Sequence, residues 1–182
     1  VPCIIFSLYN LAFMGYIAMS SYIYVDVFGL SEQLYSYFFA ANAALSMIGP
    51  MLYVRFMTGF DKKKFALNCF ALYAVCGIFI VVLLVNEQFL FWLGFAPFSL
   101  AGTITRPFGT NIMLDQQSGD TGSASSLING VATVLGSIGM MCAAMWGNIV
   151  AGLGIMICLT GIVSILGWLL LMRSSVPCRG VK

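Results

Sequence analysis

The residues of this chain that could do chemistry are hydrogen-bonding side chains and one arginine, placed at helical spacing inside apolar segments. Ser99, Thr103, Arg106 and Thr110 follow one another at intervals that place them on one face of a helix. The sequence has no histidine, and its six carboxylates all lie at the ends of apolar segments or in turns. Histidine-dependent catalysis and acid–base work by paired buried carboxylates are therefore excluded. We expect a binding site rather than an enzyme.

Two other apolar segments carry candidate binding residues near the start of the chain. Tyr9 and Phe13 share one helix face, and Asn10 lies on a second face. A buried amide needs hydrogen-bond partners, which a neighbouring helix or a water-filled cavity supplies. Asn42 and Ser46 begin a polar and small stripe further on, and this stripe fits helix packing and pore lining equally well.

The segment around residues 123–147 combines two stripes about a quarter-turn apart. The polar stripe is Ser126, Asn129, Thr133 and Ser137. The small-residue stripe is Ala132, Gly136, Gly139, Ala143 and Gly147. We expect the small stripe to pack closely against another helix while the polar stripe meets water.

The composition is that of an integral membrane protein. Hydrophobic residues make up 61% of the 182 and charged residues 8%, with a mean hydropathy of +1.00, whereas a soluble domain carries about 25% charge. Apolar stretches of about 20 residues or more predict transmembrane helices. Six are expected, at 2–26, 34–57, 65–86, 89–114, 123–147 and 148–172. The third and sixth have few polar side chains and are expected to face lipid.

The six cysteines are scattered without a C-x-x-C pair, so we interpret them as small apolar residues rather than a disulfide set or a metal site. No cofactor is expected, and no nucleic-acid partner. The chain starts at Val1 without a signal peptide. We therefore expect it to be a piece of a longer protein.

Charge placement predicts the orientation in the membrane. Basic residues follow the second and sixth predicted spans, at 55–64 and 173–182, while Asp26, Glu32 and Glu87 lie at the opposite ends of the helices. The positive-inside rule then places both termini of this segment on the cytoplasmic side of a plasma or inner membrane. Arg106 lies inside the fourth span. It faces either a cavity or, by extending its side chain, the lipid headgroups.

Several motifs resemble the major facilitator superfamily. The turn RFMTGFDKKK (55–64) is similar to its short cytoplasmic loop motif through Gly59, Asp61, Lys62 and Lys64. Asn111 followed by GSASSL (122–127), together with the order of aromatic and polar residues over 22–42, resembles the bicyclomycin-resistance type of drug:proton antiporter.

The resemblance implies the carboxy-terminal half of a twelve-span transporter, with an amino-terminal six-helix half missing. The implied fold is all-α, with six transmembrane helices in two inverted three-helix repeats, 1–87 and 88–174, and a cytoplasmic tail, 175–182. The family keeps its principal loop motif, its antiporter motif and the membrane carboxylate for proton coupling in its other six helices, so this half lacks them and the coupling site cannot be placed on it. Its implied partners are small amphipathic substrates, protons and the lipid bilayer.

These considerations define two sets of candidate site residues. The substrate cavity would be lined by Tyr9, Asn10, Phe13, Asn42, Ser46, Ser99, Thr103, Arg106, Asn129 and Thr133. The cytoplasmic loop or gate would be formed by Gly59, Asp61, Lys62, Lys64, Asp115 and Asp120. The alternatives are a uniporter or symporter of a polar metabolite, and a six-helix scaffold without substrate. In a scaffold, the polar stripes would be consumed by bonds between helices.

Overall fold

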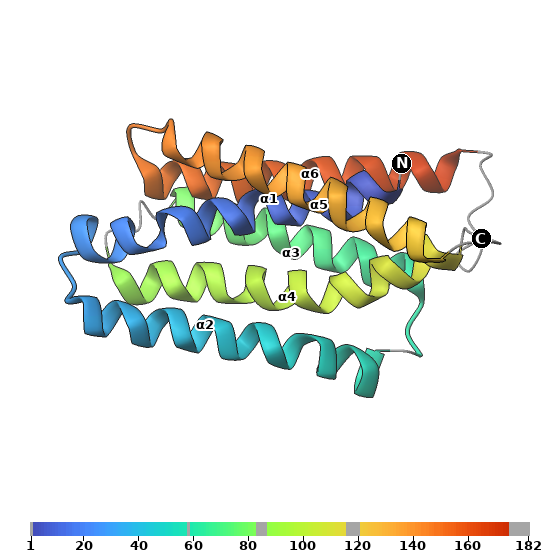
Figure 1. Ribbon diagram of the computed structural model, residues 1–182, viewed down its shortest axis with the longest axis horizontal. Coiled ribbons are helices and arrows are strands. Elements are labelled where there is room, and N and C mark those ends of the chain that lie inside the picture. Colours follow the sequence, from blue (N-terminus) through green and yellow to red (C-terminus); the bar gives the residue numbers. More distant parts are fainter. Residues whose placement is uncertain (1, 58, 83–86, 116–120, 175–182) are drawn as a thin grey trace.

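Six long helices run side by side along the molecule, each in the direction opposite to the helix before it (Figure 1). The computed structural model describes residues 2–57, 59–82, 87–115 and 121–174, except for the side chains of 56 and 57. The helices are α1 (Pro2–Ser21), α2 (Glu32–Leu52), α3 (Lys62–Val82), α4 (Gln88–Asp115), α5 (Thr121–Ala144) and α6 (Ile149–Arg173). Two π-helical segments, η1 (Tyr22–Val27) and η2 (Tyr53–Met57), extend α1 and α2.

Each of the six helices is long and apolar enough to cross a bilayer. Because lipid offers no partner to backbone polar groups, such segments must satisfy their own hydrogen bonds as helices. The described residues contain no strand. The prediction of an all-α, multi-pass membrane fold is confirmed.

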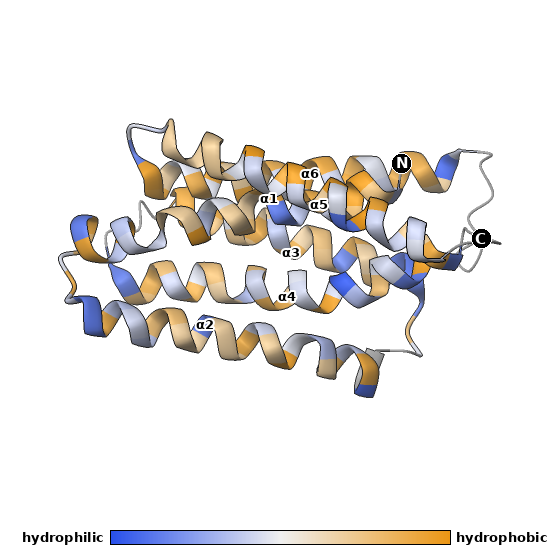
Figure 2. Ribbon diagram, in the orientation of Figure 1, coloured by the Kyte–Doolittle hydropathy of each residue, from blue (hydrophilic) through white to orange (hydrophobic). Residues whose placement is uncertain are grey.

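Hydrophilic residues gather mainly at the two ends of the bundle, with a few isolated positions between them (Figure 2). We call the end where α1, α3 and α5 begin the basic end, because Arg55, Lys62 and Arg173 lie there. The opposite end, with Asp26, Glu32 and Glu87, is the acidic end. The predicted tail at 175–182 lies outside the described residues.

Short polar residues fix where three of the helices begin. The Ser31 hydroxyl accepts a hydrogen bond from Leu34 N at 3.3 Å, and Asp61 Oδ1 accepts one from Lys63 N at 3.0 Å. Asn148 Oδ1 does the same for Ala151 N at 3.1 Å. Each oxygen satisfies an amide that has no partner within its own helix.

Two predicted boundaries are corrected by these helix starts. The third helix begins at Lys62 rather than at 65, because Asp61 precedes it and caps it. The fifth helix ends at Ala144 rather than at 147, and a turn leads to the Asn148 cap of α6. From the sequence alone, the apolar run through Met145 and Trp146 is predicted to continue the fifth helix.

The helices pair in a regular pattern. The most extensive contacts join α1 to α5 and α3 to α6, followed by α2 to α4, α1 to α6, and α3 to α4. Exchanging α1, α2 and α3 with α4, α5 and α6 maps this set onto itself: the α1–α5 and α2–α4 pairs change places, as do α1–α6 and α3–α4, while α3–α6 is unchanged. Helices α1 and α4 lie at the centre of the bundle, while α2 and α5 each contact essentially one central helix and leave most of their surface exposed.

Glycines bring the two most extensive helix pairs close together. A Cβ on Gly139 of α5 would lie 2.6 Å from the carbonyl carbon of Leu11 in α1. A Cβ on Gly77 of α3 would lie 2.6 Å from Cα of Cys158 in α6. Because these neighbours are backbone atoms, a side chain at either position would force the helices apart.

The core between α1, α3, α4 and α6 is rich in aromatic rings. Phe6 of α1 contacts Phe70, Phe108 and Trp168, each with ring centroids within 5.7 Å. The Trp168 indole donates a hydrogen bond to the Lys63 carbonyl at 3.3 Å. Trp168, with Thr160 and Ser164, lies on a buried face of α6. The expectation that α3 and α6 face lipid is therefore wrong for one face of each helix, since these faces pack on each other and on the central helices.

Candidate functional site

Five of the predicted cavity residues form a hydrogen-bonded group between α1, α2 and α4. The Tyr9 hydroxyl donates to the Ser99 carbonyl oxygen at 3.4 Å, and the hydroxyls of Ser46 and Ser99 are 3.0 Å apart. Ser46 also donates to the Asn42 carbonyl at 3.0 Å, and Thr103 to the Ser99 carbonyl at 3.1 Å. We call these five residues the interhelical network. Its bonds tie α2 and α1 to the centre of α4.

Three residues of the interhelical network are buried, while Ser46 and Thr103 are half-buried. Ser99 is fully buried, and Tyr9 and Asn42 are only 4% exposed. Phe13, another predicted cavity residue, stacks on the Tyr9 ring at a centroid distance of 5.1 Å. The structure therefore places Tyr9 and Phe13 in an aromatic core rather than in an open cavity. The amide oxygen of Asn42 is buried without a hydrogen-bond partner among the described residues.

The remaining four predicted cavity residues line one pocket between α1, α4 and α5. Asn10 comes from α1, Arg106 from α4, and Asn129 and Thr133 from α5. The pocket has a volume of about 150 Å³. Its other lining residues are Met14, Ala132, Gly136, Ser137 and Met140. We call it the arginine pocket.

The polar residues of the arginine pocket lie at matching depth. Asn10 and Asn129 each follow the first residue of their helix by about 12 Å, at 1.5 Å rise per residue. Arg106 precedes the last residue of α4 by about 14 Å. All three measurements start from the basic end of the bundle. Antiparallel packing thus brings three distant parts of the sequence to one level of the predicted membrane span.

One charge and two amides of the arginine pocket have no side-chain partner within the described residues. Arg106 is exposed, and no carboxylate of the described part of the chain pairs with it. Asn10 is 5% exposed. The amide groups of Asn10 and Asn129 make no side-chain hydrogen bond to another described residue. The pocket therefore presents free donors and a positive charge.

The two stripes of α5 lie as the sequence predicts. Gly136, Gly139 and Ala143 are buried against α1, while Thr133 and Ser137 are exposed. The Thr133 hydroxyl donates to the carbonyl of Asn129 at 2.9 Å, and Ser137 donates to that of Thr133 at 3.1 Å. These hydroxyls are thus satisfied by their own helix. The small stripe ends earlier than predicted, because Gly147 lies beyond α5 and is exposed.

The predicted loop residues lie at the basic end. Gly59 precedes α3, Asp61 caps it, and Lys62 and Lys64 occupy its first turn, all of them exposed. Asp115 is the exposed last residue of α4. Asp120 lies outside the described residues. Asp61 therefore has a structural role as a helix cap, whatever else the loop does.

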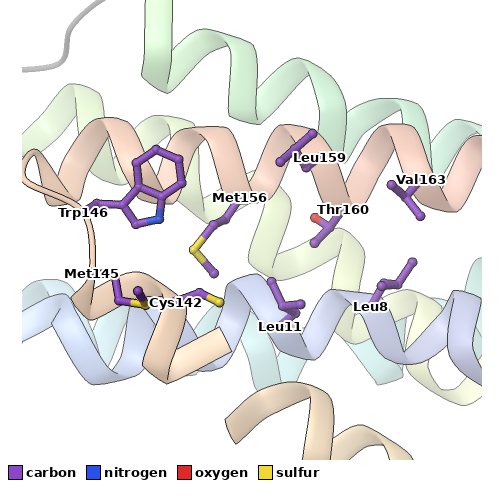
Figure 3. Close-up of a pocket in the computed structure, with 9 residues that line it drawn as sticks. All are labelled: Leu8, Leu11, Cys142, Met145, Trp146, Met156, Leu159, Thr160 and Val163. Carbon is purple, nitrogen blue, oxygen red and sulfur yellow. The ribbon is translucent and has the colours of Figure 1, made fainter. Parts of the chain in front are cut away.

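Two pockets with mostly apolar linings have about three times the volume of the arginine pocket. One, of about 450 Å³, lies between α1, α5 and α6 and is lined by residues such as Leu11, Met156 and Val163 (Figure 3). Its single hydroxyl, on Thr160, donates to the Ile157 carbonyl of the same helix at 2.8 Å. The other, of about 460 Å³, lies between α3 and α4. Neither contains a residue of the predicted cavity, so size alone does not identify the site.

Met14 and Met140 are pocket-lining residues that the cavity prediction missed. Met14 lies one turn after Asn10, and Met140 lies on the exposed side of α5. Helical spacing from Asn10 and Ser137 is the sequence signal that could have found them. Methionine has neither a strong hydrogen-bonding group nor an aromatic ring, so its residue type alone does not mark it as a binding residue.

Comparison of the chain with protein-family models, with curated protein sequences and with solved structures found no match. The fold and the arginine pocket therefore provide the basis for a functional proposal, together with the sequence motifs.

Proposed function

We propose that the chain is one half of a secondary active transporter that moves small amphipathic compounds across a membrane by alternating access, in exchange for protons. The proposal takes the six helices as the carboxy-terminal half of a twelve-helix major facilitator protein, with both ends of this segment in the cytoplasm. The basic end of the bundle would then be the cytoplasmic end.

The observation that carries this proposal is the arginine pocket. A charged residue within a span is costly to place in hydrocarbon and faces a cavity or a partner in most membrane proteins. Here Arg106 shares a pocket with two amides from two other helices. A site built at the meeting of separate helices changes shape when those helices move, which alternating access requires.

The packing pattern supports the proposal of two inverted repeats. Helices α1, α2 and α3 and helices α4, α5 and α6 make corresponding contacts when the two groups are exchanged. Successive groups of three antiparallel helices have opposite orientations in a membrane, so the exchange corresponds to an inverted repeat. The largely exposed surfaces of α2 and α5 offer a face to the proposed amino-terminal half.

The interhelical network supports a second candidate, a membrane scaffold without substrate. Ser46, Ser99 and Tyr9 use their hydroxyls to bind neighbouring helices, which a scaffold would need. The arginine pocket favours the transporter instead, because Arg106 and the amides of Asn10 and Asn129 have no side-chain partner among the described residues. Solute flux distinguishes the two candidates.

The test is uptake into inside-out vesicles that contain the full-length protein, driven by an imposed pH gradient. The probes are fluorescent amphiphiles of positive, neutral and negative charge. We expect gradient-dependent uptake of at least one probe. We expect Arg106→Ala to abolish that uptake at normal protein level, and Arg106→Lys to lower it, because lysine lacks the planar fork of donors.

One result would count against transport, and another against the arginine pocket as the site. Absence of gradient-dependent uptake for all probes, with the protein folded and inserted, would favour the scaffold. Wild-type uptake by Arg106→Lys would place the guanidinium at the lipid headgroups, where a positive charge on a long side chain is sufficient.

A further inference from the structure

We infer that the arginine pocket binds an anionic group of the substrate, so that the transported compound is an amphipathic anion with a carboxylate or a similar acid. This inference deepens the proposed function and depends on it, since the pocket is taken as the substrate site. A suitable probe for such a substrate is a carboxylate attached to an apolar ring system.

The first argument is charge. Arg106 lies about 14 Å from the basic end of α4, and no described carboxylate pairs with it. Among the described residues, every acidic side chain lies at a helix end or in a turn. A guanidinium at this depth is stabilised when an anion binds to it. The described part of the chain supplies none, which leaves the position open to a ligand.

The second argument is the set of donors around the guanidinium. A carboxylate has two oxygens and accepts paired hydrogen bonds from an arginine fork. Asn10 and Asn129 carry amide groups on two sides of the same pocket, and neither amide binds another described side chain. Their N–H groups are suited to the remaining lone pairs of the anion. Thr133 and Ser137 already donate to their own helix and need no ligand acceptor.

The third argument is size. Small-molecule sites have volumes of roughly 300–1,000 Å³, whereas the arginine pocket has about 150 Å³. It can therefore enclose the acid group but not a whole drug-sized compound. Met14 and Met140 form the apolar part of its lining. Methionine side chains adapt to ligands of different shape, so the apolar body of the substrate would lie against them.

A lipid phosphate is a second source of the same anionic chemistry. The position of Arg106 is close enough to the basic end that an extended side chain approaches the headgroup region. The arrangement of Asn10 and Asn129 favours the substrate, because both amides lie at the depth of Arg106 instead of nearer the helix ends. The experiment separates the two sources.

The test measures binding of dansylglycine and of its methyl ester to the full-length protein in phosphatidylcholine nanodiscs, by the rise in dansyl fluorescence. The ester carries an uncharged methyl ester in place of the negatively charged carboxylate, and the two probes are otherwise the same. We expect the acid to bind about tenfold more tightly than the ester, as for one charge-assisted hydrogen-bond pair. Arg106→Gln should reduce the ratio to about one, and Arg106→Lys should retain part of it.

Arg173→Gln is the matched control, because Arg173 is an exposed arginine at the end of α6. It removes the same charge from the same end of the bundle and should leave the ratio unchanged. Equal affinity of wild-type protein for acid and ester would overturn the inference. So would a preference for the acid that survives Arg106→Gln. The measurement is repeated with phosphatidylglycerol added to the nanodiscs to test the lipid source. If a lipid phosphate occupied Arg106, the ratio of acid to ester affinity would be the same for the wild-type protein and for Arg106→Gln in both membranes.

The outcomes also separate this inference from the proposed function. A charge preference that depends on Arg106, without gradient-driven uptake, would contradict transport while leaving the anion site in place. Gradient-driven uptake without any charge preference would contradict the anion site while leaving transport in place.

Discussion

Gly139 offers the sharpest test of how α1 and α5 pack. An added Cβ at this position would lie 2.6 Å from the Leu11 carbonyl carbon and 2.8 Å from Leu11 Cα. Both atoms belong to the backbone of α1, so relief requires a movement of the whole helix rather than of one side chain. Gly15, across the same interface, would meet the Gly139 carbonyl oxygen at 3.1 Å. We therefore expect Gly139→Ala to destabilise the bundle.

The magnitude follows from comparison with a matched glycine. Gly130 lies in the same helix, is exposed, and has no atom within 4 Å of an added Cβ. Both Gly→Ala changes gain helix propensity, about 1 kcal/mol at most. Only Gly139→Ala creates overpacking, which costs about 1–3 kcal/mol. The difference in the free energy of unfolding between the two variants should therefore be about 1–3 kcal/mol.

The assay is reversible unfolding in mixed micelles with increasing dodecyl sulfate, followed by tryptophan fluorescence. Trp146 reports on the turn before α6, and Trp168 reports on α6 itself. We expect Gly130→Ala to unfold at or above the wild-type midpoint and Gly139→Ala clearly below it. Equal midpoints for the two variants would show that α1 and α5 are not in close contact at this level, and the pairing of the helices would have to be revised.

Two further predictions concern topology and the interhelical network. In a cysteine-free background, membrane-impermeant thiol reagents should label cysteines at Ser31 and Glu87 from outside the cell, and at Phe60 only after permeabilisation, because the basic end is expected in the cytoplasm; the reverse pattern would contradict that orientation. Ser99→Ala should lower the free energy of unfolding by about 0.6 kcal/mol, and by at most about 1.7 kcal/mol, as is typical of interhelical hydrogen bonds, and it should leave binding of the dansyl acid unchanged. Loss of binding without loss of stability would place Ser99 in the site.

The sequence alone was sufficient to predict that this is a membrane protein and where its helices lie. Apolar runs of about 20 residues have one solution in lipid, since only a helix satisfies every backbone group within the segment. Local chemistry also accounts for the start of α2, where the Ser31 side chain accepts a hydrogen bond from Leu34 N. The stripes of α5 followed from helical periodicity, because residues about 100° apart on a helix point to different surroundings.

The sequence could not distinguish the interhelical network from the arginine pocket. Asn42 and Asn129 occur in similar contexts, each on a polar stripe of an apolar helix. Asn42 is buried because α2 lies against α4 at that level, whereas Asn129 is exposed because the stripe of α5 that packs on α1 is the neighbouring one. Which of two equivalent amides is buried is set by the pairing of helices, and that pairing is not a local property.

The same reason separates Tyr9 from Asn10. They are consecutive in α1, yet Tyr9 contacts Ser99 of α4 and Asn10 lines the pocket with α5. Helical geometry determines that the two side chains diverge by about 100°. It does not determine which helix lies in each direction. Only the packing of α4 on one side of α1 and α5 on another, through the close contact at Gly139, directs Tyr9 into the core and Asn10 toward Arg106.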